Sequence, residues 1–251
     1  MKKKVAIIGS GIAGLTAANL FKKNNNFEIM VYEREKTLSL EEGYGIQLAP
    51  NSISILNKIG FTNFDKDNFF NPSKLSFYSI DNKKICDLDL TRFNTDTIKY
   101  TTLKRSVLIE FLKEGLFSNN IKFGKEVKKI SKIKQKLLIN FTDNTNDLAD
   151  FVIVSDGVFS KTKSIIEAKA IQPIYNGSIT IRSIIKSPED LNYENKSISL
   201  IMLPNAHIVI YPINKKNEFN LVCTIRQKSF HKKNINTIIE KEIFSQNQNL
   251  K

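Results

Sequence analysis

A glycine-rich hexapeptide near the start of the chain has the residue types and the spacing that hold a phosphate group. Its members are Gly9, Ser10, Gly11, Ile12, Ala13 and Gly14. In a G-x-G-x-x-G motif the first glycine permits a sharp turn from strand to helix, the second leaves room for a pyrophosphate, and the third lets the helix pack closely on the strand. The free N–H groups and the dipole of that helix favour an anion at its N-terminus.

A carboxylate stands where such a motif needs one for a ribose. Glu33 follows the alternating stretch Phe27–Tyr32, which predicts a second strand. A carboxylate at this place accepts hydrogen bonds from the ribose hydroxyls and repels a 2′-phosphate, so NADP is disfavoured at this site. A strand, a helix and a strand within about thirty residues are what a dinucleotide-binding βαβ unit requires.

Two later positions could also contact a cofactor. Asp156 and Gly157 follow the apolar stretch Phe151–Ser155, which predicts a buried strand; an Asp-Gly pair there is also typical of an ordinary turn. Arg105 opens the amphipathic segment Arg105–Phe117, which predicts a helix. Its guanidinium could lie in solvent or could donate to a phosphate as a fork. Spacing alone does not decide whether Asp156 and Gly157 contact a cofactor or form an ordinary turn. It also does not decide whether Arg105 binds a phosphate or lies in solvent.

The elements that must position these residues change in kind along the chain. After the βαβ unit the pattern predicts a short helix over residues 51–58 and a hairpin with strands Leu75–Ile80 and Lys84–Leu90. Mostly strands follow residue 177, and a last helix is predicted near Asn236. Further strands are predicted at Ile121–Phe123, Val127–Ile130, Leu137–Phe141, Ser178–Ile185, Ser197–Met202, His207–Pro212 and Glu218–Ile225. This order predicts an α/β nucleotide domain and a mostly β domain that interleave in sequence, if the hairpin pairs with the strands after residue 177.

The charge of the chain is strongly basic, with a net charge of +13 and a pI of about 9.5. The lysines are scattered in short groups such as Lys22-Lys23, without the interleaved aromatic residues of a single-strand binder. Abundant lysine, asparagine and isoleucine are what an AT-rich genome would produce. We therefore expect no nucleic-acid partner. No apolar run reaches the roughly 18 residues of a membrane span, so we expect no transmembrane segment.

The cysteines and histidines do not form a metal site. Cys86 and Cys223 lie far apart, each in an apolar strand-like stretch, and His207 and His231 have no partner at the spacing of metal ligands. We expect both cysteines to be buried, reduced thiols in a cytoplasmic protein, and both histidines to be structural or surface residues. No triad for nucleophilic catalysis and no paired acid–base carboxylates are present, so no catalytic residue is predicted.

Several segments, taken in order, resemble the FAD-dependent aromatic hydroxylases of the para-hydroxybenzoate hydroxylase type, which include salicylate hydroxylase-like and ubiquinone-biosynthesis hydroxylases. The segments are GSGIAG with YERE, GYGIQLAPNSISILNKIGF, LKRSVLIEFL, DFVIVSDGVFSKTK and HIVIYPI. The resemblance covers residues 1 to about 230 and depends on the ordered set. It implies a Rossmann-like FAD-binding domain over residues 1–72 and 93–176, with an interleaved, mostly β substrate domain over residues 73–92 and 177–251.

The resemblance implies a role for several residues toward FAD. Glu33, with Arg34 beside it, would bind the adenosine ribose, Arg105 would contact the pyrophosphate region, and the backbone at Val127 would lie by the adenine. The backbone around Gln47 would approach the flavin.

The Asp-Gly pair and the co-substrates also follow from the resemblance. Asp156 and Gly157 match the family's Asp-Gly motif, which is linked to FAD and to NAD(P)H use. NAD(P)H has no nucleotide-binding domain of its own in this family; it reduces the flavin, and O2 then hydroxylates an aromatic or quinone-precursor ring. Two alternatives stay open: a non-hydroxylating FAD oxidoreductase on the same fold, and a non-catalytic FAD-binding remnant.

One motif of the family is absent. A Gly-Asp pair, which in the family helps to hold the flavin half of the cofactor, occurs nowhere in the sequence. We therefore expect a C-terminally truncated member that binds FAD weakly and hydroxylates poorly, because the flavin site would be open to water. Apolar faces meant for the missing part would be exposed, so an oligomer or a partner could cover them.

Overall fold

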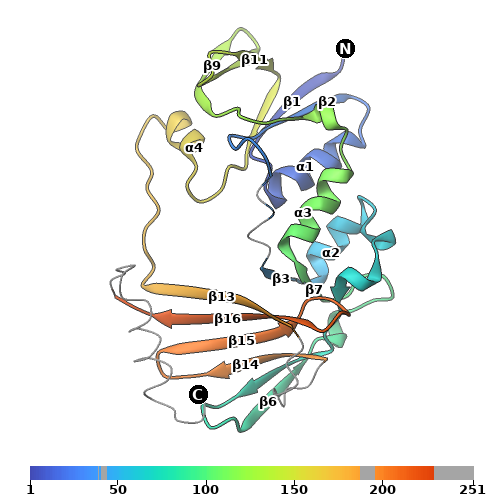
Figure 1. Ribbon diagram of the computed structural model, residues 1–251. Coiled ribbons are helices and arrows are strands. Elements are labelled where there is room, and N and C mark those ends of the chain that lie inside the picture. Colours follow the sequence, from blue (N-terminus) through green and yellow to red (C-terminus); the bar gives the residue numbers. More distant parts are fainter. Residues whose placement is uncertain (39, 41–43, 187–195, 229–251) are drawn as a thin grey trace. The chain divides into compact units, whose positions relative to one another are not determined.

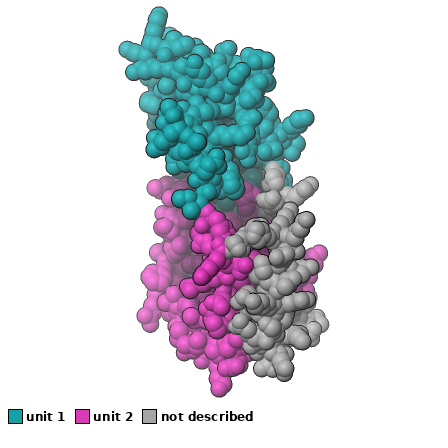
Figure 2. Space-filling model, turned by 90° about the vertical axis from the view of Figure 1, so that its left-hand side faces the viewer, with its two compact units in different colours: residues 1–42, 106–174 teal, residues 43–105, 175–251 magenta. Residues whose placement is uncertain are grey.

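The computed structural model describes residues 1–38, 40, 44–186 and 196–228. The helix predicted near Asn236 and His231, which was predicted to be a structural or surface residue, lie outside the described residues. The chain forms two compact units, residues 1–42 with 106–174 (unit 1) and residues 43–105 with 175–251 (unit 2), which interleave in sequence. Figure 2 shows them in teal and magenta. Segments 44–72 and 93–105 thus pack with unit 2, and the naming of the units as cofactor and substrate domains stays a prediction.

Unit 1 is built on a parallel sheet of four strands in the order β12-β1-β2-β8 and an antiparallel sheet in the order β11-β10-β9. Its strands are β1 (Lys3–Ile8), β2 (Phe27–Tyr32), β8 (Ile121–Lys122), β9 (Val127–Ile133), β10 (Lys136–Phe141), β11 (Asn146–Ala149) and β12 (Phe151–Val154). Its helices are α1 (Ile12–Lys22), α3 (Arg105–Glu114, whose first residue clusters with unit 2), the 3-10 helix η4 (Ser118–Asn120) and α4 (Lys161–Ile166).

The predicted βαβ unit is confirmed. β1 lies in the middle of the parallel sheet and is buried from Val5 to Ile8, as this continuous apolar run predicts. Helix α1 buries Leu15 and Ala18, and helix α3 buries Leu108 and Leu112 on the side that the amphipathic pattern predicts. Helix α3 ends at Glu114, three residues before the predicted end.

The prediction that Phe151–Ser155 is a buried strand is wrong in one respect. β12 is an edge strand of the parallel sheet, and the side chains of Phe151 and Val154 are 52% and 36% exposed. A run of apolar residues predicts a strand, but it does not tell whether both neighbours of that strand are present.

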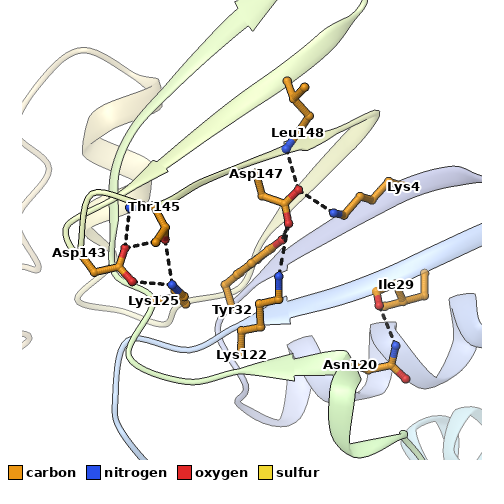
Figure 3. Close-up of polar contacts among 10 residues, drawn as sticks. All are labelled: Lys4, Ile29, Tyr32, Asn120, Lys122, Lys125, Asp143, Thr145, Asp147 and Leu148. Carbon is orange, nitrogen blue, oxygen red and sulfur yellow. Dashed lines mark hydrogen bonds and ion pairs between the residues drawn. The ribbon is translucent and has the colours of Figure 1, made fainter.

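A polar network ties the antiparallel sheet of unit 1 to the parallel sheet (Figure 3). The carboxylate of Asp147 on β11 accepts hydrogen bonds from the hydroxyl of Tyr32 on β2 and, at 2.6 Å, from Nζ of Lys4 on β1. Nζ of Lys122 on β8 lies 3.7 Å from the same carboxylate. Burial, and then the hydrogen bond to Asp147, raise the pKa of Tyr32 far above its usual range, so its hydroxyl remains a donor.

Unit 2 is built on a sheet of six strands in the order β13-β16-β15-β14-β5-β6, visible in Figure 1, and a small sheet in the order β3-β7-β4. Its strands are β3 (Gly45–Leu48), β4 (Phe69–Phe70), β5 (Lys74–Tyr78), β6 (Lys84–Asp89), β7 (Thr101–Lys104), β13 (Ser178–Lys186), β14 (Ser197–Met202), β15 (Ala206–Pro212) and β16 (Glu218–Arg226). Its helices are α2 (Pro50–Asn57) and the 3-10 helices η1 (Phe61–Asn63), η2 (Lys66–Asn68) and η3 (Thr91–Phe93).

The predicted hairpin β5–β6 joins the later strands, because β5 pairs in parallel with β14. The prediction that Cys86 is buried is wrong: it lies on β6, the edge strand of the six-stranded sheet, and is exposed. Cys223 is buried as predicted, and burial raises the pKa of its thiol to about 11. His207 is exposed on β15, as predicted for a surface residue. No helix among the described residues is long and apolar enough to cross a membrane.

Candidate functional site

The turn between β1 and α1 requires a glycine at two of its positions, Gly9 and Gly14. Gly9 has a φ of +101°, and a Cβ built on it would lie 2.6 Å from the backbone oxygen of Ser155. A Cβ on Gly14 would lie 2.0 Å from the oxygen of Gly9, so helix α1 packs directly on the turn. Both glycines therefore do within the chain what the motif predicts of them.

Gly11 differs from its two neighbours in the motif. It has an ordinary φ of −75°, and no atom lies within 4 Å of the position that its Cβ would take. The packing of unit 1 therefore does not require a glycine here. Open space in front of Gly11 is what the close approach of a phosphate would need.

The N-terminus of α1 has no group of its own to satisfy its first N–H groups. Gly11 is the N-cap residue, no side chain caps the helix, and the first turn contains no acidic residue. The N–H groups of Ile12 and Ala13 thus have no partner within the helix. Together with the helix dipole they form a site of positive potential beside Gly11.

The carboxylate of Glu33 lies beside this turn and is held by three donors. The backbone N–H of Ser10 donates to Oε2 over 2.8 Å, the Oγ of Ser10 donates to the same oxygen over 2.7 Å, and the N–H of Glu35 donates to Oε1 over 3.0 Å. Burial raises the pKa of Glu33, but these hydrogen bonds outweigh it and bring the pKa below its usual value. An ionised acceptor is therefore fixed at the end of β2.

Two neighbours of Glu33 complete this side of the site. Arg34 is partly exposed, and its Nε lies 3.2 Å from Oε1 of Glu35 and donates to it. The segment before Val127 runs along the residues that follow β2, because Lys125 N donates to Glu33 O over 2.7 Å. Val127 itself buries its side chain in the core of unit 1, so only its backbone is left for a ligand.

The Asp-Gly pair lies at the same edge of the sheet. β12 runs parallel to β1, and the Cβ of Gly9 would lie 2.8 Å from the Cα of Asp156. The Asp156 carboxylate accepts from Ser160 Oγ over 2.6 Å and from Thr162 N over 3.3 Å, so it organises the start of α4. Gly157 has a φ of +85°, with no atom within 4 Å of a Cβ.

A cavity of about 280 Å³ opens beside this pair. Its lining includes Ser155, Asp156, Gly157, Ser160 and Lys163. The structure therefore gathers the glycine turn, Glu33 and Asp156-Gly157 at the carboxyl edge of one parallel sheet, the place where ligands bind in open α/β sheets. Sequence reasoning missed two serines. Ser10 donates to the carboxylate of Glu33, and Ser160 donates to the carboxylate of Asp156.

Arg105 is the first residue of α3, and its backbone N–H donates to the oxygen of Tyr44 over 2.9 Å. Its side chain is half-buried, and within the described residues it makes no hydrogen bond or ion pair. A half-buried guanidinium of this kind is suited to an anionic ligand.

A second group of polar side chains surrounds Gln47 in unit 2. Oε1 of Gln47 accepts from the hydroxyl of Tyr100 over 2.8 Å. A cavity of about 330 Å³ has Gln47, Arg182 and Tyr211 in its lining, together with Val209. Burial raises the pKa of Tyr211 to about 12, although Arg182 and Gln47 act in the opposite direction. Tyr211 is therefore a neutral donor.

Gly45 fixes the strand that carries Gln47. Its N–H donates to Oδ1 of Asn220 over 2.7 Å, and a Cβ built on Gly45 would lie 2.5 Å from the Cβ of Asn220. β3 thus approaches β16 as closely as a glycine allows. Sequence reasoning missed Tyr100, Arg182 and Tyr211, because they come from three distant strands or loops and no local spacing links them.

The described residues contain no group of three or more His, Cys, Asp or Glu side chains that could hold a metal ion.

Comparison with known proteins gives relatives for most of the chain. The family described as "NAD(P)-binding Rossmann-like domain" matches residues 7–41. The 6-hydroxynicotinate 3-monooxygenase of Pseudomonas fluorescens is 26% identical over 74% of this chain and 48% of its own length. The salicylate hydroxylase of Pseudomonas putida is 21% identical over 90% of this chain and 55% of its own length. The chain spans about half the length of the curated relatives it matches.

Solved structures share the fold. HpxO of Klebsiella pneumoniae, complexed with FAD and uric acid, matches with a TM-score of 0.84 and 17% identity over 96% of this chain and 61% of its own. A salicylate hydroxylase substrate complex matches with a TM-score of 0.75 and 18% identity over 91% of this chain and 57% of its own. The described residues therefore have a Rossmann-like fold with mixed sheets that known hydroxylases also have.

Proposed function

We propose that this chain, whose sequence relatives are FAD-dependent aromatic monooxygenases, forms the FAD-binding and substrate-sheet part of an enzyme that uses NAD(P)H and O2 to hydroxylate an aromatic ring. The observation that carries the proposal is the open space at Gly11, in front of an uncapped helix N-terminus and beside the ionised Glu33. Nothing in the packing of unit 1 accounts for a glycine at this position, whereas a bound pyrophosphate does.

The residues at the carboxyl edge of the parallel sheet fit the ADP half of FAD. The N–H groups of Ile12 and Ala13 would donate to the pyrophosphate, with Arg105 as a second donor, and Glu33 would accept from the ribose hydroxyls. The Glu33 carboxylate would repel a 2′-phosphate, which disfavours NADP in this place.

Four further residues complete the proposed cofactor site. Asp156 and Gly157 line the cavity of about 280 Å³, and Gly157 leaves room for a ligand because no atom lies near its Cβ position. The exposed side chain of Arg34 and the backbone of Val127 lie on the adenosine side, along the segment that follows β2.

Gln47 and the cavity of unit 2 would bind the aromatic ring of the substrate. Bound FAD would supply the electron transfer and the activation of O2, which no side chain of this chain can supply. The chain's own part is to bind and orient: Gln47 is held by Tyr100, and Tyr211 stays neutral as a donor in the same cavity wall. No group of the chain needs to act as a nucleophile.

The edge strand β12 is where we infer that an additional partner would lie. Phe151 and Val154 on this edge strand and Phe159 beyond its end are exposed, whereas parallel sheets are usually covered on both faces. A second copy of the chain or another polypeptide would bury these side chains. A cytoplasmic location, for which the two free thiols Cys86 and Cys223 are the support, also stays a proposal.

The experiment is a titration of the purified chain with FAD, followed by the quenching of flavin fluorescence. We expect saturable binding, and we expect Glu33→Gln to weaken it by about 10-fold, the loss of one charge-assisted hydrogen bond. Glu35→Gln is the matched control, since Glu35 is an exposed neighbour whose carboxylate pairs, within the described residues, with Arg34 alone. An unaltered chain that does not bind FAD, or equal losses in the two variants, would contradict the proposed site.

The hydroxylation step is tested by NADH oxidation and oxygen uptake with bound FAD and a panel of aromatic compounds. Stimulation of NADH oxidation by a ring compound, with a hydroxylated product, supports the monooxygenase. Stimulation without such a product indicates a non-hydroxylating FAD oxidoreductase. FAD binding without any NADH oxidation indicates a non-catalytic FAD-binding protein.

A further inference from the structure

The antiparallel sheet of unit 1 has two unlike faces. Side chains alternate between the faces along each strand. The face that belongs to the core of unit 1 carries four buried residues, Val127, Ile139, Phe141 and Ala149. The residues between them point to the opposite face, and Figure 3 shows the side chain of Leu148 directed away from the Asp147 network.

Three apolar side chains gather on that opposite face. Leu138 lies opposite Leu148 in the register, and it is the diagonal neighbour of Ile133, which lies opposite Lys136. Leu148 and Ile133 are 42% and 46% exposed, and Leu138 is half-buried. Each of them alone would be ordinary on a protein surface, and together they form a small apolar patch.

Four lysines adjoin this patch, and all four are exposed. Lys129 and Lys136 share the face of the patch, Lys134 lies in the turn between β9 and β10, and Lys128 is the residue left unpaired where the register of these two strands shifts. Within the described residues Lys128, Lys129 and Lys134 form no ion pair, whereas Nζ of Lys136 lies 4.0 Å from Oδ2 of Asp150. We call the patch and the four lysines the basic face.

Few carboxylates are near the basic face. Asp147 is the only acidic residue of the three strands. Its register places it on the core face, where it accepts hydrogen bonds from Tyr32 and Lys4 (Figure 3). Asp143, in the turn before β11, accepts a hydrogen bond from Lys125. The basic face therefore has a positive potential and suits an anionic partner.

Two observations favour a lipid surface over a macromolecule as this partner. β10 has six residues, so the three strands present a face of about 20 Å by about 14 Å, or about 300 Å². A stable protein interface needs about 800 Å² on each partner. The basic face also has no aromatic side chain on which a nucleic-acid base could stack, because Phe141, the only aromatic residue of the three strands, lies on the core face.

A bilayer can contact both the charged and the apolar part of the basic face. A membrane surface that contains anionic lipids attracts each nearby lysine separately, so a small face suffices for weak binding. The stems of lysines can lie along apolar side chains while their ammonium groups reach the lipid phosphates. Leucine and isoleucine side chains between such lysines can enter the headgroup region.

We propose that the basic face binds the surface of an anionic lipid bilayer, with Leu148 and Ile133 in the headgroup region and the four lysines on the lipid phosphates. The inference goes beyond the proposed function and is independent of it, because the basic face contains no residue of the proposed cofactor site or of the cavity at Gln47. The protein would bind at the membrane surface without crossing the bilayer.

The test measures the binding of the full chain to lipid vesicles by sedimentation. Vesicles of phosphatidylcholine with about 30% phosphatidylserine should bind the chain at least about 10-fold more tightly than vesicles of phosphatidylcholine alone. Raising the salt from about 0.1 M to about 0.5 M should remove this difference, because salt screens the charges on both surfaces. Equal binding to the two kinds of vesicle at the lower salt would overturn the proposal.

Two double variants separate the basic face from the overall charge of the chain. Lys129→Gln with Lys134→Gln should weaken binding to the anionic vesicles by about 20-fold, about 5-fold for each charge. Lys83→Gln with Lys99→Gln, two exposed lysines of unit 2, gives the same net charge and should stay within about 2-fold of the unaltered chain. Equal losses in the two double variants would overturn the proposal, because the vesicles would then attract the net charge of +13 and no particular face.

A tryptophan introduced at the patch reports whether the patch enters the bilayer, since the chain contains no tryptophan of its own. In Leu148→Trp the emission should move to shorter wavelength when anionic vesicles are added, because the indole enters the headgroup region. Leu88→Trp is the matched control: Leu88 is 45% exposed on the edge strand β6 of unit 2, and its emission should not move. A shift in both variants, or in neither, would contradict the proposed placement of Leu148.

A soluble polyanion is the alternative partner, and the same assay distinguishes it. Leu148→Ser should weaken binding to the anionic vesicles by about 3-fold, because an apolar contact with the bilayer is lost. It should leave the binding of poly-glutamate and of a single-stranded oligonucleotide unchanged. If the chain bound either polyanion more tightly than the vesicles, and Leu148→Ser bound the vesicles normally, the partner would be a macromolecule and the membrane proposal would be wrong.

Discussion

The glycine turn of unit 1 and the Gln47 cavity of unit 2 are built in opposite ways. At the turn, the proposed site is formed by backbone groups of one short segment. That segment contains Gly9, Gly14 and the first N–H groups of α1. In the cavity, side chains from β3, β13 and β15 meet, far apart in sequence. The turn can hold a group that many proteins share, whereas the cavity can be changed residue by residue without disturbing a backbone motif.

The largest effect that we expect comes from a methyl group at Gly14. A Cβ there would lie 2.0 Å from the oxygen of Gly9, a backbone atom that cannot rotate away. Gly14→Ala should lower the free energy of unfolding by about 3 kcal/mol, the upper part of the range for an overpacked site, and should abolish FAD binding. Chemical denaturation followed by circular dichroism measures the first effect, and the FAD titration measures the second.

Gly11→Ala is the control that separates folding from binding at the turn. Because no atom lies within 4 Å of its Cβ position, this variant should keep the stability of the unaltered chain to within about 0.5 kcal/mol. It should nevertheless weaken FAD, since the new methyl group occupies the space that a pyrophosphate needs. If Gly11→Ala bound FAD normally, the open space would have no part in the site.

A smaller loss is expected at the one glycine on which the cavity of unit 2 depends. In Gly45→Ala the new Cβ would lie 2.5 Å from the Cβ of Asn220 and 2.8 Å from Cγ2 of Ile213. The Cβ of Asn220 is fixed by the backbone of β16, but Cγ2 of Ile213 can move, so part of the strain can relax and we expect a loss of about 1–2 kcal/mol in the free energy of unfolding. The same denaturation series measures it, and no change in the midpoint would show that β3 is not held against β16.

The contrast also explains how much the sequence could predict. The βαβ unit was predictable because its chemistry is local. Three glycines at fixed spacing follow the first strand, and Glu33 follows the second. Arg182 and Tyr211 were not, because only the register of β13, β16 and β15 brings them to one face, and register is a property of the whole sheet.

The errors at the sheet edges have the same cause. Cys86 and Phe151 lie in apolar stretches that read as buried strands, yet both strands stand at the edge of their sheets. Hydrophobicity predicts which residues can pack on a neighbour, and the topology decides whether the neighbour is there. The roles of the predicted cofactor residues stay predictions, because only a measured ligand turns an arrangement of residues into a binding site.

The smallest effect that we predict is a dependence on pH at Glu33. Hydrogen bonds from Ser10 and Glu35 bring its pKa below the usual 4.5 despite burial, so the ionised form stabilises the folded state. A carboxylate with a depressed pKa contributes stability that is fully present above the unfolded value and is lost as the pH falls through the folded value.

Glu33→Gln should therefore be less stable than the unaltered chain by about 1 kcal/mol or less at pH 7, and the difference should shrink below pH 4.5 (about its ordinary pKa). Denaturation midpoints of the two proteins across this pH range measure it. A difference that stays constant down to acid pH would mean that the three donors fix the shape of the side chain and not its charge. Glu33 would then be no stronger an acceptor for a ribose hydroxyl than an amide oxygen is. The turn of unit 1 would differ from the cavity of unit 2 in its backbone geometry alone.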